Sequence, residues 1–159
     1  MVLLVAIGFY VVTDTFSVSG IASSAHSGIL YLPGVFIGFV FILTIKFRKS
    51  PFDLSMSHHA HQEMVKGMTT EISGNILGLT ELSHWYENIF LLGVVALFIV
   101  NKNWWSIPIA IGVCLLIYFL EILIDNVFPR VKWKSMLKYA WLVTLIAGVT
   151  NFMVLVLIG

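Results

Sequence analysis

Residues 107–124 read IPIAIGVCLLIYFLEILI, and this stretch decides the fold class. It contains a single charged side chain, Glu121. About 20 predominantly apolar residues are enough for a helix to cross the hydrocarbon core of a bilayer. The whole chain has the same character, because 59% of its residues are hydrophobic, 11% are charged and its mean hydropathy is +0.98. Soluble domains are much more polar, so the sequence predicts an all-α integral membrane protein.

Other apolar runs predict the remaining helices of a single membrane domain, residues 1–159. The opening run is about half a span long and lacks the basic start and cleavage site of a signal peptide, so it is expected to be a partial helix. Pro33 stands near the start of its run, where a helix tolerates proline. We therefore expect a bundle of about five transmembrane helices, the first one partial. The predicted helices are 1–13, 28–45, 85–100, 107–124 and 139–158.

Basic residues are distributed unevenly between the predicted loops. Loops 46–84 and 125–138 fall on one side of the membrane, and the only lysine or arginine on the other side is Lys102. Cytoplasmic loops carry an excess of lysine and arginine. The sequence therefore predicts that both loops are cytoplasmic. Their basic residues are Lys46, Arg48, Lys49, Lys66, Arg130, Lys132, Lys134 and Lys138.

Most ionisable side chains lie in one polar segment, RKSPFDLSMSHHAHQEMVKGMTTEISGNILGLTELSHWYE (48–87), which holds five of the eight carboxylates and four of the five histidines. Apolar residues recur there every fourth position from Met56 to Met68, which predicts a short amphipathic helix at the membrane surface. Glu81, His84 and Glu87 follow in steps of three. This spacing predicts a ridge of titratable groups that enters the bilayer.

Three groups of residues have both a functional and a purely structural explanation. The histidines at 58, 59 and 61, with Glu63, could bind a metal, but a solvated loop face that contacts a partner is favoured, and no metal site is predicted. Glu121 could reach the cytoplasmic face or belong to an ion path. Cys114 has no second cysteine, which excludes an intrachain disulfide and a four-cysteine iron–sulfur cluster.

The motifs SPFDL, QE and TTEISG, followed by FPRVKWKSMLKYAW, resemble the membrane subunit of complex I called subunit 1. In that family the first group forms the loop that joins the peripheral arm to the membrane arm. The resemblance covers essentially the whole chain and implies about eight transmembrane helices, of which this sequence matches the last four and part of another. Either a fragment or a split subunit is expected, completed by a further chain or a missing N-terminal half. The matching positions are Pro51, Phe52, Asp53, Leu54, Glu63, Glu71, Ser73, Gly74, Pro129, Arg130, Met136 and Trp141.

The positions at which this sequence differs from the complex I motif favour one branch of related proteins. Ser55, His58 and His59 stand where quinone-using enzymes have acidic residues, and SHHAHQEMVKGMTTE and ELSHWYEN resemble the membrane anchor subunit of Ech-type energy-converting nickel–iron hydrogenases. That resemblance implies a prokaryotic plasma membrane, hydrogenase small and large subunits as partners, and antiporter-like membrane subunits. It also implies that iron–sulfur clusters and the nickel–iron site are in partners, with no cofactor in this chain. No nucleic-acid partner is predicted.

The residue pattern and the resemblance together lead us to expect two roles. The chain docks the electron-transfer arm, and it couples ferredoxin-dependent proton reduction to proton or sodium translocation. Two alternatives stay open: a quinone-site subunit of an NADH:quinone oxidoreductase-like complex, and a membrane anchor that does not pump. No catalytic residue is predicted in this chain. The predicted coupling residues are Glu63, Glu71, Glu81, His84, Glu87 and Glu121. The predicted docking residues are Pro51, Phe52, Asp53, His58, His59, His61, Gly74 and Arg130.

Overall fold

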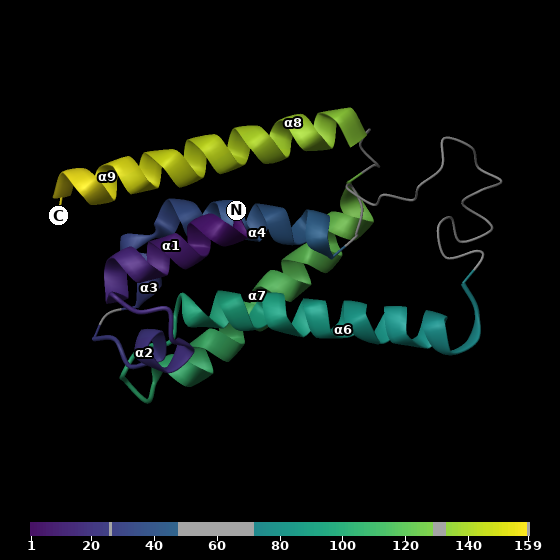
Figure 1. Ribbon diagram of the computed structural model, residues 1–159, viewed down its shortest axis with the longest axis horizontal. Helices are drawn as coiled ribbons and strands as arrows, with labels where there is room; N and C mark the ends of the chain where they lie inside the picture. Colours follow the sequence, from purple (N-terminus) through teal and green to yellow (C-terminus); the bar gives the residue numbers. More distant parts are fainter. Residues whose placement is uncertain (26, 48–71, 129–132, 159) are drawn as a thin grey trace.

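The computed structural model describes residues 1–25, 27–47, 72–128 and 133–158, and all regular structure in these ranges is helical. This confirms the all-α prediction (Figure 1). Among these residues, the helices Ser106–Val127 and Lys134–Leu155 are long and apolar enough to cross a membrane. The predicted number of about five spans stays a prediction. The elements are α1 (Val2–Thr13), α2 (Val18–Ala22), α3 (Gly28–Tyr31), α4 (Pro33–Lys46), α6 (Gly74–Leu97), α7 (Ser106–Val127), α8 (Trp133–Val143), the π-helix η2 (Thr144–Val149) and α9 (Thr150–Ile158).

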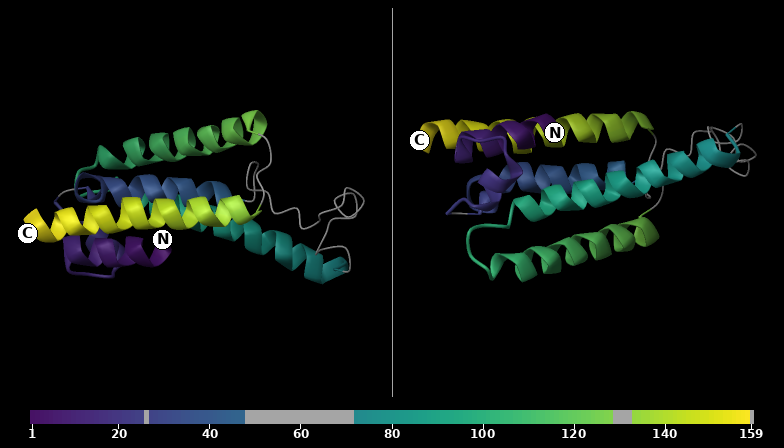
Figure 2. Two further views of the ribbon diagram at one scale, coloured as in Figure 1. Left: turned by 90° about the horizontal axis from the view of Figure 1, so that it is seen from above. Right: turned by 60° about the horizontal axis from the view of Figure 1, so that its bottom comes forward.

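Helix α4 is the centre of the bundle. Val35, Phe39 and Leu43 are fully buried, and they recur every four residues, which places them on one face of the helix. Helix α4 contacts α1, α6 and the continuous rod formed by α8, η2 and α9. Helix α7 packs against α6 on the far side of α4 from that rod (Figure 2).

Phe98, just after α6, joins three helices in the core. Its ring centroid lies 4.7 Å from that of Phe9 in α1 and 5.3 Å from that of Phe36 in α4. Its carbonyl oxygen accepts a hydrogen bond of 2.8 Å from the Ile29 N–H of α3. One buried aromatic residue therefore fixes the positions of α1, α3 and α4 relative to the end of α6.

The predicted helix 28–45 is divided at Leu32 into α3 and α4, directly before the proline near its start. Pro33 has no N–H to donate and begins α4. The amide of Asn151, in α9, satisfies backbone groups on both sides of the break. Its Oδ1 accepts a hydrogen bond of 3.2 Å from the Val35 N–H, and its Nδ2 donates one of 3.2 Å to the Tyr31 carbonyl oxygen.

The rod of α8, η2 and α9 approaches α4 closely beside this break. A Cβ atom at Gly34 would lie 2.7 Å from the Ala147 carbonyl oxygen of η2. The π-helical turn was not predicted from the sequence. Such turns are rare insertions within α-helices, and here the turn lies against the glycine that permits close contact.

Two other helices begin earlier than predicted. Helix α6 begins at Gly74 rather than Trp85, and α8 begins at Trp133 rather than Tyr139, so the predicted loops 46–84 and 125–138 are partly helical. The prediction took its boundaries from apolar runs, but a helix continues through polar residues when no proline interrupts it. The predicted amphipathic helix in residues 48–71 lies outside the described residues.

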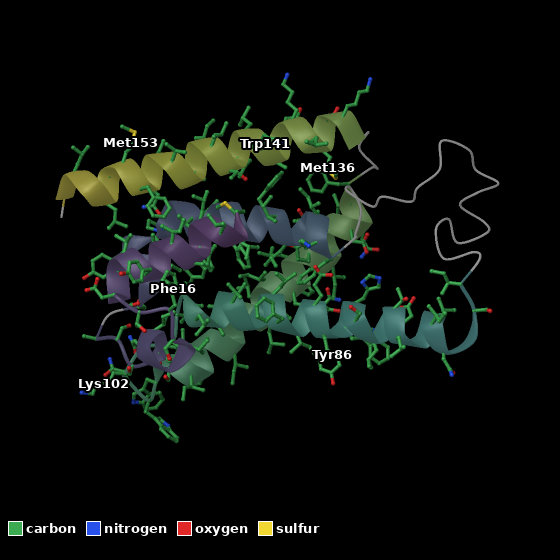
Figure 3. The ribbon with its side chains drawn as sticks, in the orientation of Figure 1. Phe16, Tyr86, Lys102, Met136, Trp141 and Met153 are labelled. Carbon is green, nitrogen blue, oxygen red and sulfur yellow. The ribbon has the colours of Figure 1, made fainter. Side chains whose placement is uncertain are left out.

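The outer surface of the bundle is strongly apolar. Tyr86 of α6 and Met153 of α9 are directed away from the bundle (Figure 3), with 66% and 62% of their surface exposed. Leu116 and Phe119 on α7 are similarly exposed. An aqueous surface of this kind would be unfavourable, whereas hydrocarbon surrounds such side chains at no cost. The architecture is therefore that of a membrane protein.

Candidate functional site

One end of the bundle, here called the Lys46 end, holds the C-terminal ends of α4 and α7 and the N-terminal end of α8. Helix α6 runs past these ends, and its own N-terminal end extends further out (Figure 1). The connection between α6 and α7, with Lys102, lies at the opposite end, here called the Lys102 end. Both predicted basic loops therefore leave the bundle on the same side, as the alternation of helices requires.

An ion pair connects two helices at the Lys46 end. Lys46 Nζ lies 2.9 Å from Oε1 of Glu87, and the two side chains are 48% and 36% exposed. Lys46 occupies the last turn of α4, where a positive charge interacts favourably with the helix dipole. The pair thus attaches the end of the central helix to the middle of α6.

Glu121 lies on the inner face of α7. Together with Ala110 and Ile117 it forms a buried stripe with helical spacing, and only 1% of its surface is exposed. The carboxylate therefore does not reach the aqueous face, which was one of the two interpretations of the sequence. A buried carboxylate costs free energy unless it is paired or protonated.

Glu121 and the ion pair lie at the same depth in the bundle. The Cys114 thiol donates a 3.4 Å hydrogen bond to the Leu92 carbonyl oxygen, which fixes the register of the antiparallel helices α6 and α7. Counting seven residues from this contact in each helix, about 10 Å, places Glu121 level with Trp85. Glu87 is about half a turn from that level. The Lys46 end therefore has ionisable groups from three helices at one depth.

A contact between aromatic rings supports this placement. The ring of Phe47, directly after Lys46, lies 6.4 Å from that of Tyr118, three residues before Glu121. The end of α4 is therefore beside the part of α7 that carries the buried carboxylate.

The predicted ridge on α6 does not form a single face. His84 and Glu87 are half-buried, whereas Glu81 is exposed. A step of three residues falls short of a full turn of 3.6, so the three side chains wind around the helix. Of these predicted coupling residues, His84 and Glu87 face the bundle, together with Glu121 from α7.

Two further ionisable residues at this end were missed as candidate site residues. Lys46 was counted only for membrane orientation, because nothing in the sequence links it to Glu87 across 41 residues. Asp125 lies one turn beyond Glu121 on α7 and is half-buried. Asp125 is four residues from Glu121, and this helical spacing could have indicated that the two carboxylates lie on the same side of α7.

Gly74 is the one predicted docking residue that lies within the described part of the chain. This residue begins α6 with φ of +60°, a conformation that glycine adopts without strain. The positive φ explains why a glycine stands at the start of α6, whereas a role of Gly74 in docking stays a prediction. The remaining docking residues and two of the coupling residues lie outside the described residues, namely Pro51, Phe52, Asp53, His58, His59, His61, Arg130, Glu63 and Glu71.

No group of three or more His, Cys, Asp or Glu side chains within the described part of the chain could hold a metal ion. The histidine cluster considered from the sequence lies outside that part. What the described site offers instead is a set of groups that can bind and release protons.

A comparison with protein families decides the relationship of this chain to known proteins. The family model described as NADH dehydrogenase matches residues 1–156. The chain belongs to this family. An NADH-quinone oxidoreductase subunit of Syntrophotalea carbinolica is 25% identical over 148 residues, covering 88% of this chain and 43% of that protein. The Aquifex aeolicus protein of the same name is 24% identical over 136 residues, covering 79% of this chain and 39% of that protein.

The chain spans less than half the length of these curated NADH dehydrogenase relatives. No solved structure matches it. The predicted resemblance to this membrane subunit of complex I is confirmed by the family match. Neither of these relatives is named as a hydrogenase subunit, so the closer relationship to hydrogenases stays a prediction.

Proposed function

We propose that the chain is a membrane subunit of a complex I-type oxidoreductase, which couples electron transfer in partner subunits to ion translocation. Its family and the names of its relatives support this assignment. The observation that carries the coupling role is the buried Glu121 at the depth of the Lys46–Glu87 pair. Costly ionisable groups inside a membrane bundle are typical of proton and ion paths.

In the proposed mechanism this chain holds no redox centre and responds to charge. A docked partner that holds an iron–sulfur cluster would, once reduced, supply negative charge near the Lys46 end. The Lys46 ammonium group moves towards that charge, which weakens its attraction for the Glu87 carboxylate and favours the binding of a proton there. When the ion pair forms again, Glu87 releases the proton towards the interior, where Glu121 and His84 are the next groups able to accept it.

We propose quinone as the electron acceptor of the complex. Both relatives are named as subunits of NADH-quinone oxidoreductase, which favours this reading over the hydrogenase predicted first. The partners are then the peripheral electron-transfer subunits, which supply the iron–sulfur clusters, and antiporter-like membrane subunits. The complex lies in a prokaryotic plasma membrane with loop 46–84 facing the cytoplasm, because that side carries eight of the nine basic residues.

One observation favours a second candidate, the energy-converting hydrogenase. Ser55, His58 and His59 stand in the predicted docking loop where quinone-using relatives were expected to have acidic residues. In that case the partners carry a nickel–iron site, protons are the electron acceptor, and the same groups at the Lys46 end couple the reaction to proton or sodium movement.

The two candidates are distinguished by purifying the intact complex through a tag on this chain. Quinone reduction that drives acidification of proteoliposomes, with no nickel in the preparation, supports the quinone-linked function. Stoichiometric nickel with hydrogen evolution from reduced ferredoxin supports the hydrogenase. Turnover that is insensitive to uncouplers, with no ion movement, would identify a membrane anchor and contradict the coupling role.

A further inference from the structure

A groove opens at the Lys102 end, away from the coupling groups. Its volume is about 370 Å³, which lies within the usual range for small-molecule sites, roughly 300–1,000 Å³. It lies between the segment that begins α3 and the first two turns of α7. Here it is called the α3–α7 groove.

The lining of the α3–α7 groove changes from polar to apolar with depth. Its outer part is formed by Ser27, Asn101 and Asn103, which lie in the connections at the bundle end. Ile109 and Val113 line its inner part, one and two turns into α7. Val113 lies seven residues beyond the start of the helix, about 10 Å towards the membrane centre. A ligand matched to this groove has a polar head and an extended apolar chain.

The polar end of the groove is rigidly built. The Ser106 hydroxyl donates to the Asn103 carbonyl oxygen at 2.6 Å and accepts the Asn101 N–H at 3.1 Å. The Asn101 Oδ1 accepts the Asn103 N–H at 3.0 Å. These bonds hold the two asparagines beside the groove mouth, so their arrangement does not depend on a ligand.

The charge and aromatic content of this end indicate the head group. Lys102 does not line the groove itself, but in the sequence it stands between the two rim asparagines. It is the only lysine or arginine outside the two loops at the Lys46 end. Trp104 and Trp105 follow it with 82% and 77% of their surface exposed. Exposed tryptophan is typical of the membrane–water interface, and a lysine at that level attracts the phosphate of an anionic lipid.

We propose that the α3–α7 groove binds one anionic phospholipid, with an acyl chain along Ile109 and Val113 and the phosphate at Lys102 and the rim asparagines. Bulk acyl chains are as apolar as this groove, so selection among lipids comes from the head group. The acyl chain fills space that would otherwise lack contacts. This lipid site is independent of the electron acceptor of the complex.

The test is lipid retention by the intact complex. The complex is reconstituted in nanodiscs of phosphatidylglycerol and phosphatidylcholine, extracted in mild detergent, and its retained lipid is measured by mass spectrometry. We expect about one retained phosphatidylglycerol per chain. Lys102→Gln lowers the preference for phosphatidylglycerol about fivefold, the effect of one basic residue near an anionic surface. Lys134→Gln, at the opposite end of the bundle, is the matched control and leaves the preference unchanged.

Blocking the groove tests its apolar part. Ile109→Trp fills the groove and removes the retained lipid, whereas Ile111→Trp does not, because Ile111 lies outside the groove lining on the same helix. The two isoleucines are a matched pair, 57% and 58% exposed. Equal lipid retention in both tryptophan variants would overturn the proposal. A photoreactive side chain at position 109 that captures a polypeptide rather than phospholipid would overturn it as well.

Discussion

The ammonium nitrogen of Lys46 lies 2.9 Å from a carboxylate oxygen of Glu87 and joins α4 to α6 across 41 residues of sequence. The segment between these two helices contains the loop that carries the predicted docking motifs. The ion pair therefore holds the two helices that flank this loop at a fixed separation. In the proposed mechanism, a change of charge at the loop is expected to act first on this contact.

Neutralising either member of this pair is expected to weaken the bundle slightly. Both side chains are more than one third exposed, so solvent screening limits the coupling energy to about 0.5 kcal/mol. Thermal unfolding in nanodiscs of Lys46→Gln, Glu87→Gln and the double variant gives this energy as a double-mutant cycle. The charge swap Lys46→Glu with Glu87→Lys should recover most of it. A swap no more stable than the single variants would show that the pair is not a direct interaction.

Replacing Glu121 with glutamine should separate electron transfer from ion movement. The substitution keeps the shape of the buried side chain but removes its ability to exchange a proton. We expect electron transfer to the acceptor to continue at near the parental rate, while ion translocation in proteoliposomes falls by about a hundredfold, a typical contribution of one acid–base group.

Glu81→Gln is the matched control for this experiment, because Glu81 is exposed on α6. Its effect on translocation should be much smaller. If Glu121→Gln pumped normally, the buried carboxylate would have a structural role only, and the proposed path through α7 would be wrong.

Removing the amide of Asn151 should destabilise the break between α3 and α4. Asn151→Leu loses two hydrogen bonds to backbone groups of another helix, at a cost of about 1–2 kcal/mol in the free energy of unfolding. Chemical unfolding in detergent micelles measures it. Asn126→Leu is the control, because Asn126 bonds to Ile122 of its own helix at an exposed position. Similar losses for the two variants would contradict a special role for Asn151.

A methyl group at Gly34 should force α4 away from the π-helical turn. The nearest atom to the added carbon is a backbone oxygen of Ala147, which cannot rotate away. Gly34→Ala is therefore expected to cost about 1–3 kcal/mol of stability. Gly93→Ala has no atom within 4 Å of the added carbon and should be neutral or slightly stabilising. Unfolding midpoints of the two alanine variants, compared with the parent, provide the measurement.

The sequence was sufficient for features that depend on composition and periodicity. The helical class, the apolar surface and the family resemblance follow from apolar runs and from the motifs at Pro51 and Pro129. Helix α7 begins and ends within a few residues of its prediction, because an uninterrupted apolar run predicts a membrane helix well. The start of α6 was missed because polar residues at its beginning, such as Asn75, resemble a loop when only hydropathy is considered.

Features that depend on tertiary contact could not be predicted. Pro33 indicated the start of a helix, but the separate turn α3 before it is stabilised by Asn151, which lies far away in the sequence. The burial of Glu121 depends on the side of α7 that faces α6, and several rotations of an apolar helix fit the same sequence. The pairing of Lys46 with Glu87 likewise depends on the way α4 packs on α6.

The contact between Val35 and Asn151 has a consequence for biosynthesis. The two residues are 116 positions apart, so α3 and α4 leave the ribosome long before the amide that completes them. Until α9 is inserted, the Val35 N–H and the Tyr31 carbonyl oxygen lack that partner, a costly condition in a bilayer. The break between α3 and α4 therefore acquires these hydrogen bonds only after α9 has entered the membrane.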